Sequence, residues 1–425
     1  MPQPLQLIFR LMPLALTLTL LNCEGPATAT TPETEAAPTP QTFARGTYGY
    51  DLAFLQQHDV GVKELIAADS SARIMIIPDW QGRVMTSSAA GLAGKSYGWI
   101  NYDLIAADST NGQFNPFGGE ERFWLGPEGG PFSLYFDSAV KQDFTNWRVP
   151  PALDTEAFTV ESVGTDNIVL TKATRMVNAS GNALDLGIRR SVSLLGQKNL
   201  WATLELAADD AVIAVGYETE NTITNQGATA WSEEYGFASV WLLCMFNPSE
   251  AGVVFIPVAQ ADNPDLGPLV KDDYFGKVPA DRLKVSDGTV FFRVDGKQRG
   301  KIGIPPNRAL PYAGGYDPLS QTLTIVTYNQ PEGKPRYVNS AWGEQDDPLD
   351  GDVVNSYNDG PVADGSIMGP FYEIESSSPA ALLRPGEQLT HRQRVYHFKG
   401  TPAQLDRIVR SVFDLSLTEI AQQFS

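Results

Sequence analysis

The chain has 425 residues, of which 50 are acidic and 31 are basic, and its formal net charge is −19. Nucleic-acid binding needs a basic surface, so this charge balance excludes nucleic acid as an expected partner. The two cysteines, Cys23 and Cys244, are too few for a cysteine-based metal site. Cys244 lies in an apolar run, 240–246, where we expect an inert core thiol.

Residues 1–22 have the composition of a signal peptide. They contain no Asp or Glu, a single positive charge at Arg10, and an apolar run from Leu11 to Leu21. This run is shorter than the roughly 20 residues that cross a hydrocarbon core, and it is typical of a signal peptide. The run ends in Leu-Leu-Asn-Cys, which resembles a bacterial lipobox, so we expect lipidation at Cys23. The alternative is a plain secretory signal with an incidental cysteine.

The segment after Cys23 predicts a tether. Residues 24–42 contain no large apolar side chain, so they cannot bury enough surface to offset the entropy of ordering. We expect a disordered tether over 23–43, one β domain over 44–400 and a C-terminal helical segment over 401–425. The expected location is the cell envelope, lipid-anchored to a membrane on its periplasmic side or at the cell surface. Envelope proteins are candidate partners there.

Strand-like runs dominate the body of the chain, and several alternate apolar and polar residues, as half-buried strands do. The runs are 73–77, 167–172, 184–195, 201–206, 214–224, 253–257, 289–294, 322–328 and 392–398. The turn signal Asp295-Gly296 indicates a hairpin between 289–294 and 297–303. No repeat of 20–50 residues occurs, which argues against a propeller or solenoid. The pattern predicts an all-β fold.

Helical patterns are confined to the two ends of the body. A short helix is expected over 51–58. Near the C-terminus, Thr401 is placed as an N-cap and Pro402 as the first helical residue. An apolar stripe follows, formed by Leu405, Ile408, Val409, Val412 and Phe413.

The segment 115–130 gathers glycine, aromatic and charged residues. Its paired glycines allow unusual backbone angles and the close approach of another chain or a ligand. Arg122 lies next to Trp124, with Glu120, Glu121 and Glu128 as candidate carboxylate partners. The segment is interpreted either as the rim of a polar-ligand pocket or as a loop in which Arg122 pairs with a neighbouring glutamate.

A second segment, 369–387, carries two closely spaced carboxylates. In a strand, Glu373 and Glu375 share one face, while Tyr372 and Ile374 face the core. Two carboxylates held close together raise one pKa toward the range useful for acid–base catalysis. A catalytic role for Glu373 and Glu375 is therefore predicted, and a solvated strand face is the alternative.

Between these two segments, residues 342–360 are rich in carboxylates and amides. Such oxygen ligands suit Ca²⁺, but the spacing of an EF-hand is absent, and an exposed, turn-rich loop is the preferred interpretation. No other cofactor is expected. Asn355 and Tyr357 are included among the expected ligand-binding residues.

Gly118-Gly119, the run 122–128, a late Glu-bearing strand and the run 383–387 together resemble the galactose mutarotase-like superfamily. More narrowly, the body from about Gly46 to Phe398 is similar to an uncharacterised family of bacterial envelope lipoproteins assigned to that superfamily. This narrower resemblance also rests on the segments 82–88, 98–102, 272–279 and 354–361. It implies a β-supersandwich with a sugar-sized groove across one sheet, and a carbohydrate as partner. Resemblance to true aldose 1-epimerases is distant.

Mutarotase chemistry uses a late-strand Glu as base and a mid-chain His as acid. The resemblance implies that Glu373 or Glu375 has the role of the base. The acid has no counterpart, because the three histidines are His58, His391 and His397. Ordinary aldose 1-epimerase activity is therefore not predicted, and whether the protein is an enzyme stays open.

Three functional hypotheses follow. The first is a lipoprotein that binds a carbohydrate in a groove lined by Arg122, Trp124, Glu373 and Glu375, and within it binding without turnover is favoured over processing because the acid is missing. The second is a scaffolding envelope lipoprotein without catalytic activity, whose groove is filled by its own side chains. The third is a glycoside hydrolase or epimerase with paired carboxylates. Hydrolysis would need two carboxyl groups about 5–10 Å apart across the groove. One would be Glu373 or Glu375, and the other Glu120, Glu121 or Glu128.

Overall fold

The computed structural model describes residues 42–260, 266–333, 335–362 and 364–424. The predictions of a signal peptide over 1–22, of lipidation at Cys23 and of most of the tether fall outside these residues. In the part of the chain that is described, no helix is long and apolar enough to cross a membrane.

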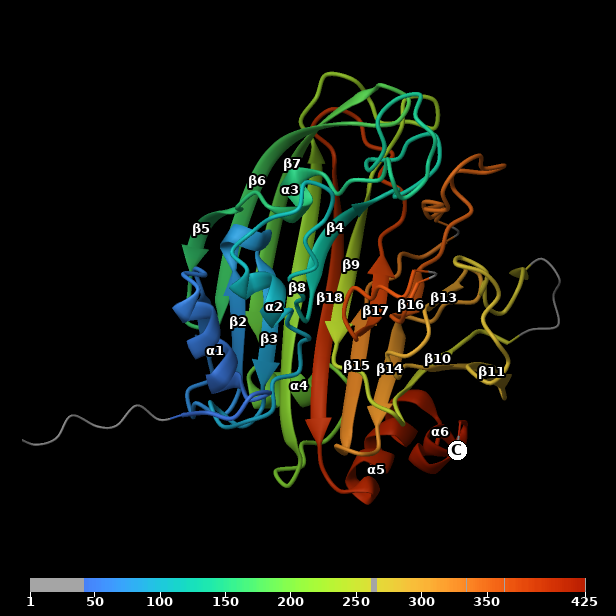
Figure 1. Cartoon of the computed structure of the whole chain (residues 1–425). Coiled ribbons are helices and arrows are strands. Elements are labelled where there is room, and N and C mark those ends of the chain that lie inside the picture. Colours follow the sequence, from blue (N-terminus) through green and yellow to red (C-terminus); the bar gives the residue numbers. More distant parts are fainter. Residues whose placement is uncertain (1–41, 261–265, 334, 363, 425) are drawn as a thin grey trace, which may run out of the picture. The chain divides into compact units, whose positions relative to one another are not determined.

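The described strands form three antiparallel sheets (Figure 1). The largest has the order β11-β12-β10-β14-β15-β18-β8-β7-β6-β5, the second β13-β16-β17-β9-β4, and the smallest β1-β2-β3. The ten-stranded sheet contains β5 (Thr159–Val163), β6 (Asn167–Val177), β7 (Ala183–Leu194), β8 (Ile213–Asn225), β10 (Val253–Pro257), β11 (Leu283–Ser286), β12 (Thr289–Arg293), β14 (Tyr312–Asp317), β15 (Thr322–Tyr328) and β18 (Gln388–Lys399). The five-stranded sheet contains β4 (Arg122–Gly126), β9 (Ser239–Phe246), β13 (Gly300–Ile304), β16 (Val354–Asn358) and β17 (Tyr372–Ser377). The three-stranded sheet contains β1 (Lys63–Ile66), β2 (Arg73–Ile77) and β3 (Arg83–Ser88).

The sheets stack around a shared apolar core, and short helices cover their outer surfaces. Ile168 and Val395 of the ten-stranded sheet pack in one buried cluster with Leu242 and Ile374 of the five-stranded sheet. The helices are α1 (Tyr48–Gln57), α2 (Tyr102–Ala106), α3 (Pro151–Asp154), α4 (Gln197–Ala202), α5 (Pro402–Phe413), α6 (Leu417–Gln422) and the 3₁₀ turn η1 (Pro78–Trp80). The apolar sides of α4, α5 and α6 form a second cluster with the other face of the ten-stranded sheet. The predicted all-β sandwich, with a short N-terminal helix and a C-terminal helical segment, is confirmed, but helices are not confined to the ends, because α2, α3 and α4 lie between strands.

Several elements have the boundaries that the sequence predicted. The runs 73–77, 253–257 and 322–328 are β2, β10 and β15. The C-terminal helix begins as predicted, because the Thr401 side chain accepts a hydrogen bond from the Gln404 backbone N–H and completes a capping box. Cys244 is a free, buried thiol, as expected.

Three structural expectations are wrong. The run 201–206 is not a strand: α4 and a turn occupy this region, and the adjacent Leu200 and Trp201 are both buried, which a helix allows and a half-buried strand does not. Asp295-Gly296 is a turn but not a hairpin, because β12 and β13 belong to different sheets. The Arg282 guanidinium donates to the Asp295 carboxylate, and the Asn358 side chain accepts a hydrogen bond from the Gly296 N–H. These two contacts fix the turn at the point where the chain passes from one sheet to the other.

The third correction concerns residues 342–360, which were expected to be an exposed loop. Their first half is exposed or partly exposed except for the buried Leu349, but Asp352 is buried and the segment continues into the buried strand β16. The pairing of β16 with β13 and β17 explains this burial, because a strand between two others has no free edge.

Gly118 and Gly119 confirm that the paired glycines permit close approach. Both have φ angles in the left-handed range, at 98° and 123°. A Cβ on Gly118 would lie 2.2 Å from the Trp99 carbonyl oxygen, and one on Gly119 would lie 2.4 Å from Cδ of Arg83. The approaching group in the structure is therefore the protein itself.

A buried polar network joins the sheets. Arg190 (β7) donates to Glu121 Oε1 at 2.7 Å, and both side chains have no exposed surface. Arg190 also donates to the Gly82 carbonyl, and Gln393 (β18) donates to Glu121 Oε2 at 2.6 Å. Residue 121 is joined to Val84 of β3 by two backbone hydrogen bonds. Residue 121 therefore links all three sheets: its carboxylate contacts the ten-stranded sheet, its backbone contacts β3, and the chain continues directly into β4 of the five-stranded sheet.

Replacing Glu121 by Ala should lower the free energy of unfolding by about 3–5 kcal/mol, because Arg190 would remain buried without its partner. Urea unfolding followed by circular dichroism measures this change. Glu233→Ala is a matched control: its pair with Arg336 is exposed, so it should cost about 0–1 kcal/mol. Equal costs for the two variants would contradict the role given to the buried pair.

Candidate functional site

The five-stranded sheet has two chemically different faces, because alternate residues of a strand point to opposite sides. Ile374 and Cys244 belong to the apolar core. Glu373 and Glu375 occupy the alternate positions of β17, and Trp241 lies at the same face of β9. The prediction that Glu373 and Glu375 share one strand face is confirmed.

Strand register brings polar side chains from distant parts of the chain together on this face. Lys301 of β13 pairs with Tyr357 of β16, which in turn pairs with Glu373 of β17. Asn355 of β16 pairs with Glu375. The sheet therefore presents a cation, two carboxylates, an amide and a phenol within three adjacent strands.

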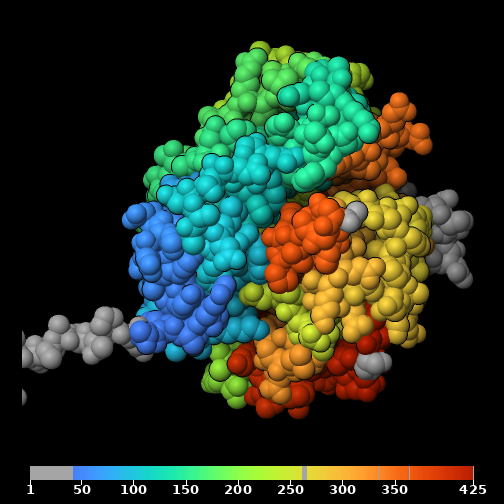
Figure 2. All heavy atoms as spheres, in the orientation of Figure 1, coloured from blue at the N-terminus to red at the C-terminus, as the bar shows by residue number. Residues whose placement is uncertain are grey.

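A cavity of about 980 Å³ lies over this face. Sheet residues form its floor, and segments outside the sheet around 128, 271–275, 338–342, 350–352 and 364–368 form its walls. Its aromatic lining residues are Phe144, Trp241, Tyr274, Phe275, Trp342 and Tyr357, and its charged ones include Glu128, Lys271, Arg299, Lys301, Asp352 and Asp359. In Figure 2 the orange segment that contains residues 364–368 projects on the near face, beside cyan residues from the first half of the chain.

Lys301 and Glu375 form the central ion pair of the floor. Lys301 Nζ donates to Glu375 Oε2 at 2.8 Å, and the indole N–H of Trp241 donates to the same oxygen at 2.8 Å. Burial disfavours the charged ammonium, but attraction to Glu375 and Glu128 outweighs it and raises the pKa of Lys301. Oε1 of Glu375 has no hydrogen-bond partner among the described residues. This oxygen is an unused acceptor.

Glu373 is paired with Arg122, whose guanidinium also lies 4.7 Å from the ring centroid of Trp124. Both partners of the ion pair are buried. Burial raises the pKa of Glu373 to about 7, although attraction to Arg122 opposes the shift. Arg122 lies in β4, so it is neither on a loop nor at a pocket rim.

Glu128 lies in the wall of the cavity. Burial raises the pKa of Glu128 to about 7, with attraction to Lys301 opposing the shift and repulsion from Glu375 adding to it. The indole groups of Trp147 and Trp342 favour the carboxylate. Close to neutral pH this group therefore exists in both protonated and ionised forms.

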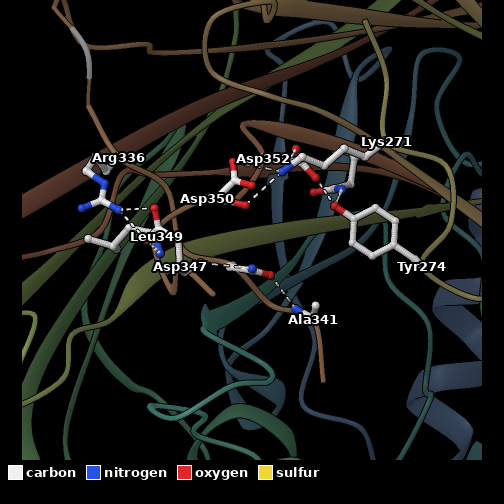
Figure 3. Close-up of polar contacts among 10 residues, drawn as sticks. Lys271, Tyr274, Arg336, Ala341, Asp347, Leu349, Asp350 and Asp352 are labelled. Carbon is white, nitrogen blue, oxygen red and sulfur yellow. Dashed lines mark hydrogen bonds and ion pairs between the residues drawn. The ribbon is translucent and has the colours of Figure 1, made fainter. Parts of the chain in front are cut away.

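A second set of polar contacts holds the opposite wall (Figure 3). Lys271 lies 3.3 Å from Asp350 Oδ1 and 3.6 Å from Asp352 Oδ1, and Tyr274 donates to Asp352 Oδ2. Burial raises the pKa of Asp352, while Lys271 lowers it. Gly303 leaves room for this arrangement, because a Cβ there would lie 2.1 Å from Asp352 Oδ2.

Figure 3 also shows how the loop before Asp350 is held. Arg336 donates to both carboxylate oxygens of Asp347, which also accepts the backbone N–H of Leu349. These contacts account for much of the carboxylate content that suggested Ca²⁺. Within the described residues, no group of three or more His, Cys, Asp or Glu is placed to hold a metal ion.

The structure brings some of the predicted site residues together and separates others. Glu128, Asn355 and Tyr357 line the cavity. Glu375 reaches the lining through Lys301 and Trp241, whereas the Glu373–Arg122 pair and Trp124 lie buried beside it. Trp124 packs edge-to-face against Trp241, with ring centroids 5.6 Å apart.

Glu120 does not belong to this group. It is fully buried in the joint between the sheets, where it accepts from Ser87 and lies 2.9 Å from Nε2 of His397. His391 is buried nearby against Ser376, and His58 follows α1. None of the three histidines lines the cavity.

Sequence reasoning missed Lys301, Trp241, Lys271 and Trp342. The expected hairpin placed Lys301 in its second strand, 297–303, with no sign of a functional role, and Trp241 stood in an apolar run that predicted only core. A usable signal existed for the segment 272–279, which supported the family resemblance and contributes Tyr274 to the cavity.

The fold and this site define a β-sandwich protein with a large cavity of mixed aromatic and charged lining. The chain belongs to a family of unknown function, DUF6786, whose model matches residues 46–424. This confirms the predicted membership of an uncharacterised family. No curated protein matches the chain.

Several solved structures are similar to the chain at low sequence identity. They include the Slr1438 protein from Synechocystis sp. PCC 6803, at 13% identity and a TM-score of 0.48, covering 79% of this chain and 95% of that one. A galactose mutarotase-like protein from Lactobacillus casei has 11% identity and a TM-score of 0.42, covering 79% and 100%. A galactose mutarotase related enzyme from Lactobacillus acidophilus has 9% identity and a TM-score of 0.45, covering 80% and 99%.

The raised pKa of Glu128 predicts a pH-dependent stability. The ordinary pKa of the group is 4.5, so between about pH 4.5 and 7 the folded protein keeps a proton that the unfolded chain loses. The contribution of Glu128 to the free energy of unfolding should therefore fall as the pH rises through this window. Glu128→Gln should remove this contribution, so the difference in free energy between the variant and the natural protein should change with pH between about 4.5 and 7.

Urea unfolding at a series of pH values from 4 to 8 measures this effect. Glu250→Gln provides the control, because the Glu250 side chain is 74% exposed and should leave the profile unchanged. Parallel profiles for the Glu128→Gln variant and the natural protein would show that Glu128 titrates normally.

Proposed function

We propose that this protein binds a carbohydrate in the cavity over the five-stranded sheet. The observation that carries the proposal is the combination of aromatic rings with paired donors and acceptors in a single cavity of about 980 Å³. Aromatic faces pack against the C–H surfaces of sugar rings, while carboxylates, amides and ammonium groups bind hydroxyls. The volume lies near the upper end of the roughly 300–1,000 Å³ typical of small-molecule sites.

The charges of the lining favour a neutral polyhydroxyl ligand. Lys301 is paired with Glu375, and Lys271 with Asp352 and Asp350. An anionic ligand would meet these carboxylates, and a cationic ligand would meet the two lysines. Hydroxyl groups can donate to the carboxylates and accept from the ammonium groups without adding a charge.

The scaffolding hypothesis predicted a groove filled by the protein's own side chains. The described residues instead leave a large cavity whose polar groups already hold one another in place. A preformed polar cavity lowers the cost of ordering the site on binding. This supports binding over a purely structural role.

Binding should be detectable as a rise in Tm and as heat in titration calorimetry with a panel of neutral mono- and oligosaccharides. Replacing Trp342 by Ala should weaken the affinity about fivefold or more, since an aromatic face contributes on the order of 1 kcal/mol. Trp80→Ala is the matched control, because Trp80 is another half-buried indole and lies outside this cavity. If the Trp342→Ala variant binds the sugar with unchanged affinity, the sugar binds outside this cavity.

A second candidate function is acid–base processing of the bound sugar. Glu128 lines the cavity and, with its pKa near 7, is suited to donate a proton when protonated and to accept one when ionised. It would supply an acid without the missing histidine. This assignment differs from the predicted roles of Glu373 and Glu375, because Glu373 is engaged by Arg122 and neither side chain lines the cavity.

Turnover would be measured as anomer interconversion by proton NMR and as hydrolysis of the sugar that binds. Loss of the protonated form of Glu128 should lower the rate above about pH 7. Glu128→Gln should remove at least 90% of the rate while leaving the sugar affinity within about twofold. Binding without turnover in the natural protein would reject this candidate and leave the binding function standing.

The lipid anchor at Cys23 and the location in the cell envelope are proposals that rest on residues 1–43 alone. Fractionation of cells that express the Cys23→Ser variant tests them. Release of the variant into the soluble fraction supports the anchor, and unchanged membrane association argues against it.

A further inference from the structure

Exposed apolar side chains gather at the mouth of the cavity. Phe144 is 65% exposed, Phe275 46%, Ile367 44%, Met368 39% and Val362 37%, and all five line the cavity. Single exposed apolar residues are ordinary on a protein surface, but a group of them around one opening marks a site of interaction. We call these five residues the apolar rim.

Neighbouring side chains hold the two phenylalanines of the rim in their exposed positions. The guanidinium of Arg299 lies 3.8 Å from the ring centroid of Phe275, and Tyr357 meets the same ring edge-on. Phe144 stacks on Trp147, with an interplanar angle of 17°. The rim is therefore a built surface and not a set of loose side chains.

The apolar rim contrasts with the floor below it. The floor carries the Lys301–Glu375 pair and Asn355, which suit hydroxyl groups. The rim adds three aliphatic side chains, which offer no hydrogen bonds and no ring face for a further sugar. A purely polyhydroxyl ligand would leave this surface in contact with water.

We propose that the natural ligand is an amphiphilic glycoconjugate, with a carbohydrate head on the floor and an apolar aglycone that lies across the apolar rim. This inference rests on the proposed carbohydrate binding and names the class of ligand. The continuity of the rim with the cavity favours this occupant over a protein partner. A stable protein interface buries at least about 1,000 Å² in total, whereas the rim surrounds an opening.

The test compares methyl and hexyl β-D-glucopyranosides, together with the corresponding galactosides and mannosides, by titration calorimetry. The protein is the full-length chain with Cys23→Ser, which removes the expected acylation site and the need for detergent. Each buried methylene should tighten binding by up to about fourfold. We expect at least one hexyl glycoside to bind ten times or more tighter than its methyl counterpart.

The double variant Ile367→Ser/Met368→Ser should lose this preference and keep the affinity for the methyl glycoside, because neither side chain is one of the aromatic lining residues. Leu319→Ser is the control, because Leu319 is 71% exposed and does not line the cavity. Equal affinity for methyl and hexyl glycosides, or a preference that survives in the double variant, overturns the amphiphile proposal alone. If neither series binds, the carbohydrate function itself fails and the amphiphile proposal fails with it.

Discussion

The ion pair between Arg190 and Glu121 sets the position of the five-stranded sheet over the ten-stranded one. Both charges are withdrawn from water, so each needs the other and the hydrogen bonds around it. Glu121 immediately precedes β4, and the strands of the five-stranded sheet follow from that point by regular antiparallel pairing. A shift at this joint would carry Arg122 and its neighbours out of register with β9 and β17.

The cavity is a consequence of this stacking. One face of the five-stranded sheet is committed to the core through Ile374 and Cys244, so the alternate residues must point away from it. Segments outside the sheet roof that second face and bury its charges, which raises the pKa of Glu128 and Glu373. The positive charge of Lys301 partly balances the negative charges of Glu375 and Glu128. Of the two carboxylates whose pKa is raised, Glu128 lines the cavity, whereas Glu373 lies beside it and is paired with Arg122.

Local patterns predicted much of the fold. Short apolar or alternating runs located β2, β10 and β15, and capping signals located α5, because these signals are local in the sequence. The failures involve information that is not local. The burial of Leu200 and Trp201 on one side depends on the ten-stranded sheet, and the separation of β12 from β13 depends on the crossing of the chain between sheets.

The candidate site was predicted only in part, for the same reason. Glu128, Asn355 and Tyr357 stood in segments of unusual composition and do line the cavity. Nothing in the sequence distinguishes Lys301 and Trp241 from other residues, because their place in the site depends on their hydrogen bonds to Glu375. Arg122 and Glu373 were expected to line the groove, but they pair with each other and lie buried beside the cavity. Their pairing depends on the order β4–β9–β17 within the sheet, which the sequence does not reveal.

The central claim is that a carbohydrate binds on the floor of this cavity, and the indole N–H signals of the eight tryptophans report on it directly. In a ¹H–¹⁵N titration with the best-binding glycoside, the signals of Trp241 and Trp342 should shift together and saturably. The signal of Trp201, which is buried in the separate cluster beneath α5, should stay in place. Saturable shifts confined to tryptophans outside the cavity, or no shift at millimolar sugar, would contradict the account.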